Sequence, residues 1–279
     1  MKKRKMAATC ILCVALGLGL FTQAVQGMDL LGDLVGGLVD GFLGSESETN
    51  THFGTYRDAE KYKAGDFTYK SDEVSKVKVY WVSGDIWVSQ GAGELSVSEE
   101  EQEKEEKKLH YLLNQDTLTI QFCSSNYKGK PWSKDLSLEI PEGVALEIST
   151  VSGSTEMGEV SLASLDYKGV SSPLEIEKAF IEGNLSVDTV SGDVEIESLS
   201  AESLTIQSVS GESKLGLSSL KKARLESVSG DMELTLLDGM GAKVSYEGLS
   251  GKNKDTTYGD GKASIQAESV SGKLKVMEK

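Results

Sequence analysis

The chain has few of the residues that build metal and redox sites. Its 279 residues include three cysteines and two histidines. Cys10 and Cys13 lie in an N-terminal segment that we expect to be removed, so only Cys123 would remain and no internal disulfide could form. His52 and His110 have no partner at zinc-ligand spacing. We therefore expect no metal, no cofactor and no disulfide framework.

Proline, aromatic residues and positive charge are also scarce. The chain has three prolines against thirty glycines, and only 6% of its residues are aromatic. This composition is typical of a turn-rich β protein with a core of Val, Ile and Leu. There are 44 acidic and 29 basic residues, which makes a formal net charge of −15. Such a surface repels phosphates and anionic lipids, so we expect neither nucleic acid nor electrostatic membrane binding.

Residues 1–27 have the pattern of a secretory signal peptide. The basic run 2–5 precedes the apolar run 7–21, and Ala24 and Gly27 offer small residues for cleavage. We therefore predict an exported protein that is secreted, extracellular or associated with the cell envelope. The alternative is an uncleaved N-terminal membrane anchor, because no charge stands between Lys5 and Asp29. Against an anchor, the apolar run is shorter than the roughly 20 residues that span a bilayer.

Residues 28–44 predict a glycine-rich amphipathic helix. Apolar pairs recur every four residues, from Leu30-Leu31 to Phe42-Leu43, in a segment with five glycines and three aspartates. This helix either packs on the domain that follows or mediates membrane contact or self-association through its small residues. A polar linker over residues 45–73 then leads to a β-strand-repeat domain over residues 74–279.

A four-residue motif, Val-Ser-Gly-Asp, recurs through the second half of the chain. A related form also begins at Val82. A fixed period of about twenty residues is the signature of a stacked repeat architecture. The seven copies are anchored at aliphatic residues spaced by 19, 20, 19, 19, 21 and 21 residues: Val151, Val170, Val190, Val209, Val228, Leu249 and Val270.

The columns of the repeat predict how each copy is built. The positions five and three before the anchor are apolar and the position between them is polar, which indicates a strand with one buried face. The residue just before the anchor is always small. The position six after the anchor is apolar in every copy except the sixth, which has Asp255. A second short strand therefore follows the turn, and an irregularity is expected near Asp255.

Two folds satisfy these columns. In an antiparallel hairpin ladder or sandwich, Ser-Gly would be a two-residue turn and the anchor would face solvent. In a parallel β-solenoid the chain bends at a corner, so the anchor and the small residue before it both point inward. The aliphatic anchors favour this second, all-β fold, with about seven rungs of 19–21 residues and an irregular β cap from residues 77–141. The valine is then core, the glycine permits the bend, the serine stacks at the corner and the aspartate is only exposed.

Two candidate chemistries lack residues that they need. A calcium site would use the column after the glycine position, but that column contains Lys252 and Lys273, which cannot coordinate a cation. Ser218 and Lys221 match the Ser-x-x-Lys pattern of serine acyl enzymes, but the chain has neither the helix nor the supporting motifs of those enzymes.

Paired carboxylates are a third candidate. Glu175 and Glu177, and likewise Glu195 and Glu197, project from one strand face, as the two acids of a polysaccharide-cleaving β-helix would. A solvated charged surface explains this column more simply. We therefore assign no catalytic, cofactor-binding or metal-binding residue.

Four features together resemble a known family. They are the strand and turn over residues 79–85, the hairpin ending at residues 118–120, the strand over residues 138–141 and the Val-Ser-Gly-Asp repeats. The chain resembles, over roughly residues 74–279, the bacterial β-strand-repeat family of unknown function whose members are called putative adhesins. The copy anchored at Val170, with Ser172-Pro173, and the segment 28–44 depart from its common pattern. The resemblance implies a β-helical, envelope-associated domain and transfers no catalytic residue.

These observations predict an exported, non-enzymatic, adhesin-like module of the bacterial cell envelope. Its partners would be envelope proteins or glycans that contact ladders of exposed side chains, or a second copy that contacts the segment 28–44. One alternative is an envelope-stress sensing or scaffold protein that uses the same segment. A carbohydrate-active enzyme is a third possibility.

Overall fold

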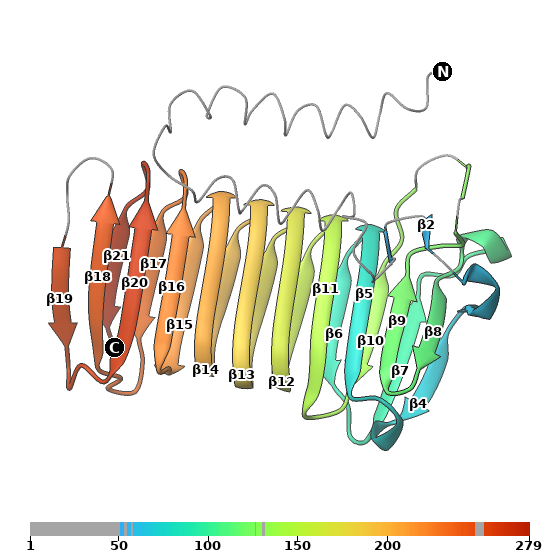
Figure 1. Ribbon diagram of the computed structural model, residues 1–279, viewed down its shortest axis with the longest axis horizontal. Coiled ribbons are helices and arrows are strands. Elements are labelled where there is room, and N and C mark those ends of the chain that lie inside the picture. Colours follow the sequence, from blue (N-terminus) through green and yellow to red (C-terminus); the bar gives the residue numbers. More distant parts are fainter. Residues whose placement is uncertain (1–50, 53–54, 57, 126, 130–131, 249–253) are drawn as a thin grey trace. The chain divides into compact units, whose positions relative to one another are not determined.

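The computed structural model describes residues 51–279 apart from 53–54, 57, 126, 130–131 and 249–253. The predictions of a signal peptide over 1–27 and of a helix over 28–44 therefore lie outside the described residues. The described residues belong to one compact unit. Its strands lie side by side along the unit (Figure 1). No helix of the described residues is long and apolar enough to cross a membrane.

Two ladders of parallel strands build this unit. In spatial order the first ladder begins with β9 (Thr117–Gln121), β5 (Lys76–Ser83) and β11 (Val144–Ser152). The C-terminal halves of three long strands follow, namely β12 (Thr155–Ser171), β13 (Leu174–Ser191) and β14 (Val194–Ser210). The ladder ends with β16 (Lys222–Ser227), β20 (Ala263–Ser269) and β18 (Ala242–Gly248).

The second ladder contains the N-terminal halves of the same three long strands. They lie between β6 (Ile86–Gln90) and β15 (Ser213–Ser219), and the ladder continues through β17 (Met232–Leu236) to β21 (Leu274–Glu278). Each of the three long strands therefore serves both ladders, and two breaks in its inside–outside alternation mark where it bends. These bends wind the chain into successive coils.

Antiparallel strands close the N-terminal end of both ladders. On the second ladder β10 (Leu136–Ile140) pairs parallel with β6, and β7 (Glu94–Glu99) and β4 (Phe67–Lys70) follow antiparallel. On the first ladder β8 (His110–Asn114) and β3 (Lys63–Ala64) follow β9. The remaining elements are β1 (Thr51–His52), β2 (Thr55–Tyr56), η1 (Ala59–Lys61), η2 (Ser71–Glu73) and η3 (Glu105–Lys107).

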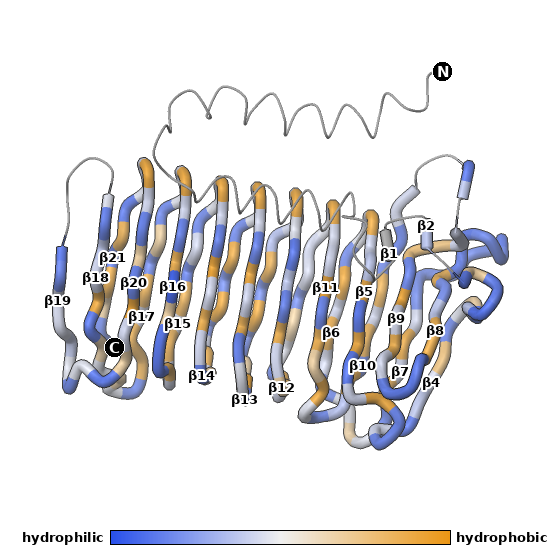
Figure 2. The backbone as a smooth tube through the Cα atoms, in the orientation of Figure 1, coloured by the Kyte–Doolittle hydropathy of each residue, from blue (hydrophilic) through white to orange (hydrophobic). Residues whose placement is uncertain are grey.

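The register confirms the predicted columns. Leu165, Leu185 and Leu204 pair in line across β12, β13 and β14, and all three are buried. Hydrophobic and hydrophilic residues alternate along the strands (Figure 2), as period-two patterning requires. The all-β class and the parallel pairing of the repeats are therefore confirmed, and the antiparallel hairpin ladder is not the fold of these copies.

The prediction for the valine anchor is wrong for most of the described copies, although Val228 is buried as predicted. In β13 and β14 the alternation continues to the turn, so the inward position falls on the small residue before the anchor. Thr189 and Ser208 are buried, whereas the anchors Val190 and Val209 are only half-buried on the outer side. Thr189 is also polar for a reason, since its hydroxyl accepts a hydrogen bond of 3.1 Å from the backbone N–H of Gly192. The small residue is thus the inner corner, and the valine lines the rim.

The serine and the aspartate of the motif bond to neighbouring coils. The Ser191 hydroxyl donates to the carbonyl of Val170 at 3.2 Å, and the same bond recurs at Ser152, Ser210, Ser229 and Ser271. The Asp193 carboxylate accepts the backbone N–H of Glu212 at 2.8 Å, and Asp85 and Asp231 behave alike. The serine therefore stacks as predicted, but the prediction that the aspartate is only exposed is wrong. The serine side chain therefore bonds to the preceding coil and the aspartate side chain to the following coil.

The repeats do not stack in sequence order at the C-terminal end. β20, from the seventh copy, pairs directly with β16 of the fifth, and β18 of the sixth copy lies outside it. After β18 the chain turns back as β19 (Lys254–Tyr258), which pairs antiparallel at the edge. Asp255 explains this reversal, because a carboxylate in the apolar column would have to enter the core. The expected irregularity near Asp255 is therefore a hairpin that lets the next copy take the inner place.

Candidate functional site

The candidate site is a groove on the outer face of the second ladder. The register places Trp87 of β6 beside Glu156 of β12, and Glu175 of β13 and Glu195 of β14 follow in the same row. The groove has a volume of about 390 Å³. Its charged and aromatic lining comprises Trp87, Glu156, Glu175, Glu177, Glu195 and Glu197. Adjacent strands place successive members of a row about 4.8 Å apart.

Strand alternation decides which residues reach this groove. Ile86 and Val88 point into the core, so Trp87 between them must point outward. Its side chain is 41% exposed, an unusual exposure for the largest side chain. The glutamates occupy the equivalent outward positions of the next three strands.

The five glutamates of the groove have little positive charge beside them, although Lys214 of β15 is the register neighbour of Glu195. In the part of the chain that the structure describes, none of them forms an ion pair, and the nearest polar contact is the Ser154 hydroxyl at 3.3 Å from Glu156. Lysines close in sequence bind elsewhere: Lys178 pairs with Glu159 and Lys214 pairs with Glu212. Most of the negative charge in the groove is therefore uncompensated, and it lies beside an exposed aromatic ring.

The groove does not have metal-site geometry. Within the described ranges no group of three or more His, Cys, Asp or Glu side chains converges as metal ligands would. The flat ladder explains this, because its carboxylates project side by side instead of toward a common point.

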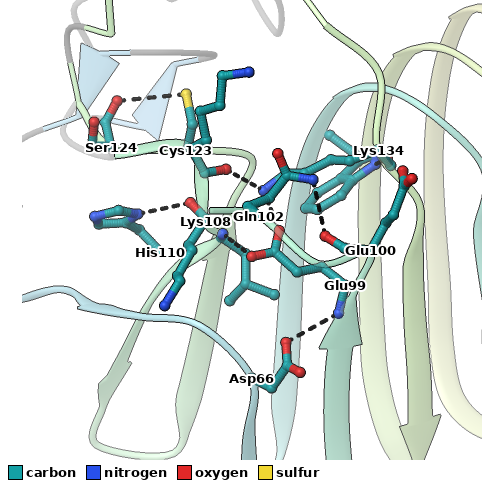
Figure 3. A network of polar contacts seen from close by, with 12 residues as sticks. Asp66, Glu99, Glu100, Gln102, Lys108, His110, Cys123, Ser124 and Lys134 are labelled. Atoms are coloured by element: carbon teal, nitrogen blue, oxygen red, sulfur yellow. Dashed lines mark hydrogen bonds and ion pairs between the residues drawn. The ribbon is translucent and has the colours of Figure 1, made fainter. Parts of the chain in front are cut away.

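A second polar cluster lies buried in the N-terminal cap (Figure 3). The Lys134 side chain is completely buried and pairs with the Glu99 carboxylate, whose side chain is 3% exposed. Lys134 Nζ also donates to the Lys107 carbonyl at 2.7 Å and lies 5.0 Å from the centre of the Trp81 ring. Glu99 in turn accepts the backbone N–H of Leu109 at 2.7 Å. Nearly every donor and acceptor of the pair is thus satisfied, as a buried ion pair requires.

Burial dominates the ionisation of this cluster. It lowers the pKa of the Lys134 ammonium to about 8, although the Glu99 carboxylate opposes that change. It raises the pKa of Glu99 against the opposing effect of Lys134, and raises the pKa of the Cys123 thiol to about 11. It also lowers the pKa of His110. Cys123 is consequently a protonated, buried thiol at neutral pH and a poor nucleophile.

Lys134 has a structural role in the cap. Its backbone N–H donates to Ser83, and its carbonyl accepts the Trp81 indole N–H at 3.0 Å. Gly84 packs so closely on the Lys134 carbonyl that a Cβ at residue 84 would overlap it. The Lys134 backbone thus takes the place of a preceding coil against the turn at Gly84, and it covers the N-terminal end of the stacked turns.

One family model matches residues 74–279, the whole of the predicted repeat domain. Its description is Toastrack DUF4097. The chain belongs to the Toastrack DUF4097 family. No curated protein matches the chain.

Solved structures similar to this Toastrack chain cover 78% of it. A putative adhesin from Bacteroides fragilis NCTC 9343 has a TM-score of 0.44 at 14% identity over 97% of its own chain. A putative adhesin from Parabacteroides merdae ATCC 43184 has a TM-score of 0.43 at 11% identity over 96% of its chain. A putative cell adhesion protein from Clostridium sporogenes ATCC 15579 has a TM-score of 0.30 at 14% identity over 100% of its chain.

The residues tested for catalysis are dispersed through the Toastrack domain. Ser218 donates to the Leu199 carbonyl at 2.9 Å, and Lys221 pairs with Glu202, so neither turns toward the other. His110 Nδ1 donates to the Lys108 carbonyl at 3.0 Å within the cap. The side chain of His52 lies outside the described part of the structure.

The glutamates named in the sequence do meet, but two other residues were missed. Trp87 was not predicted as a site residue, although its place between two aliphatic residues was a signal that it faces solvent. Lys134 had no such signal, because it stands in a polar stretch and only the fold closes over it.

Proposed function

We propose that this Toastrack protein is an exported, non-enzymatic, adhesin-like binding module of the cell envelope. The observation that carries the proposal is the groove in which Trp87 and the glutamate rows stand exposed on a rigid parallel ladder. Solenoids of about seven coils present long, regular surfaces suited to extended partners. The adhesin names of structurally similar proteins agree with an envelope location.

The form of the groove supports binding over catalysis. A glycosidase needs two carboxyl groups in unlike surroundings, one kept protonated as the acid and one ionised. Glu175, Glu177, Glu195 and Glu197 all lie exposed on the same open face. Nothing in their surroundings sets one of them apart as an acid.

The test couples binding to a product assay. The purified protein and its Trp87→Ala variant are applied to an array of envelope glycans and peptides, and every bound compound is then checked for cleavage. Binding that depends on Trp87 without any product supports the proposal. Turnover of a bound glycan, or an array on which no compound distinguishes the two proteins, would reject it.

Export is tested separately by cell fractionation. The chain with residues 1–27 should be recovered outside the cytoplasm, and a variant without them should stay inside. Retention of both in the cytoplasm would remove the envelope role.

A further inference from the structure

The geometry points to a basic polypeptide segment, bound in extended conformation, as the partner of the Trp87 groove. This inference rests on the proposed binding function and names its partner class. It depends on three properties of the groove, namely its charge, its exposed aromatic ring and its length.

The charge of the groove favours a cationic partner. Five carboxylates line it and no lysine, arginine or histidine does. The rows place like charges on neighbouring strands about 4.8 Å apart, so they repel one another in the free protein. Lysine or arginine side chains laid along the rows would relieve that repulsion, whereas a neutral ligand would leave it in place. An acidic partner would add to it.

The exposed ring of Trp87 adds a contact that suits arginine in particular. A guanidinium stacks on an indole face and remains able to bind carboxylates at its edge. The molecule already makes contacts of this kind with its own lysines: Lys178 Nζ lies 4.7 Å from the centre of the Phe180 ring, and Lys134 Nζ lies near Trp81. None of the described lysines and arginines lies over Trp87. Its ring face is therefore open to a cation from a partner.

The length of the groove matches a short extended chain. From β6 to β14 it crosses three strand intervals, about 14 Å. An extended polypeptide rises about 3.4 Å per residue, and its alternate side chains share one face about 7 Å apart. Three cationic residues at positions i, i+2 and i+4 would therefore meet Trp87, the middle of the row near Glu175, and Glu195. The inferred partner is thus a segment in which Arg or Lys alternates with small residues.

The test uses three probes on the full-length protein. They are the pentapeptide Arg-Ser-Arg-Ser-Arg with blocked ends, its counterpart Gln-Ser-Gln-Ser-Gln, and an uncharged oligosaccharide. Isothermal titration calorimetry at low and at physiological salt measures their affinities. We expect only the basic peptide to bind, with an affinity that falls as salt rises because the contacts are solvent-exposed.

Matched variants locate the binding. Trp87→Ala should weaken binding of the basic peptide about tenfold, with its salt dependence kept. Glu175→Gln/Glu195→Gln should weaken binding and also flatten the salt dependence. The control Glu142→Gln/Glu182→Gln changes the net charge equally at two exposed residues outside the groove. It should change neither the affinity for the basic peptide nor its salt dependence. Unchanged circular dichroism and thermal midpoints establish that the variants remain folded.

Two outcomes would overturn the inference. One is that the basic peptide fails to bind at low salt, or binds the groove and control variants equally. The other is that the oligosaccharide or the uncharged peptide binds in a manner that depends on Trp87. This second result would leave the proposed binding function in place and remove only the cationic partner.

Discussion

Replacing Gly192 with alanine should destabilise the protein through a single close approach between coils. A Cβ on residue 192 would lie 2.7 Å from the carbonyl carbon of Ser172 in the preceding coil, and closer still to its oxygen. The coils would have to separate at this corner to remove the overlap. Two hydrogen bonds join the coils there. The Leu174 N–H donates to the backbone carbonyl of Asp193 at 2.9 Å, and the Ser191 hydroxyl donates to the backbone carbonyl of Val170 at 3.2 Å.

The magnitude follows from overpacking and these hydrogen bonds. An extra methyl in a tight contact costs about 1–3 kcal/mol, and each weakened hydrogen bond costs about 1 kcal/mol. The smaller entropy of the unfolded alanine chain offsets about 0.4–1 kcal/mol. We therefore expect Gly192→Ala to lower the free energy of unfolding by about 2–4 kcal/mol. For a domain of this size that corresponds to a fall in Tm of about 5–15 °C.

Gly158 of β12 supplies the control, because a Cβ there would lie in open space. The nearest heavy atom to a Cβ there would be a Glu177 carboxylate oxygen at 4.0 Å. Gly158→Ala should leave stability unchanged or raise it slightly. Urea titrations followed by far-ultraviolet circular dichroism measure both variants. Equal stability of Gly192→Ala and Gly158→Ala would refute the role of the glycine as the point of contact between coils.

Three further outcomes are expected. Lys134→Met alone should lower the free energy of unfolding by about 3–5 kcal/mol, because the buried Glu99 carboxylate loses its partner. The double variant Lys134→Met/Glu99→Leu should lose much less stability. Equal losses for the two variants in denaturant titrations would contradict this. In a Cys123→Ala background the free energy of unfolding should rise by up to about 1 kcal/mol between pH 8 and 9. The reason is that the unfolded chain holds the Lys134 proton up to its ordinary pKa of 10.5, while the folded state releases it near about 8; the rise should vanish in Lys134→Met. Finally, Glu156→Gln/Glu175→Gln should raise Tm at low salt by relieving the repulsion between these two register neighbours. A scan in 1 M salt, where the Debye length is about 3 Å, should show no such gain; a gain that persists there would exclude charge as its cause.

Much of the fold could be predicted from the repeat itself. The alternation of apolar and polar columns identified the strands, and the buried leucines Leu165, Leu185 and Leu204 lie where that alternation places them. The predicted carboxylate pairs also share one face, because side chains two residues apart on a strand point the same way. These features depend only on neighbours along the chain.

The turns were harder to predict. A corner can place two adjacent side chains inward, whereas an unbroken strand places only every second side chain inward. The aliphatic anchor was assigned to the core, but alternation continues to the turn and Thr189 takes the inner position in place of Val190. The bond from Asp193 to the next coil likewise joins residues 19 positions apart. The residues of the motif alone do not indicate whether this aspartate bonds to a neighbouring coil or is only solvated.

Sequence alone determined the length of each coil, its strands and its outward charge, since those follow from local period-two patterning. Only the tertiary structure decided which coils are neighbours and which polar residues are buried. Every copy offers the same edge of backbone donors and acceptors, so the seventh copy can stack on the fifth as well as on the sixth. Asp255 resolves that equivalence by keeping its own strand out of the core. Lys134 is buried for a related reason: the first coil needs a neighbour to close its open end, and only the folded cap brings one there.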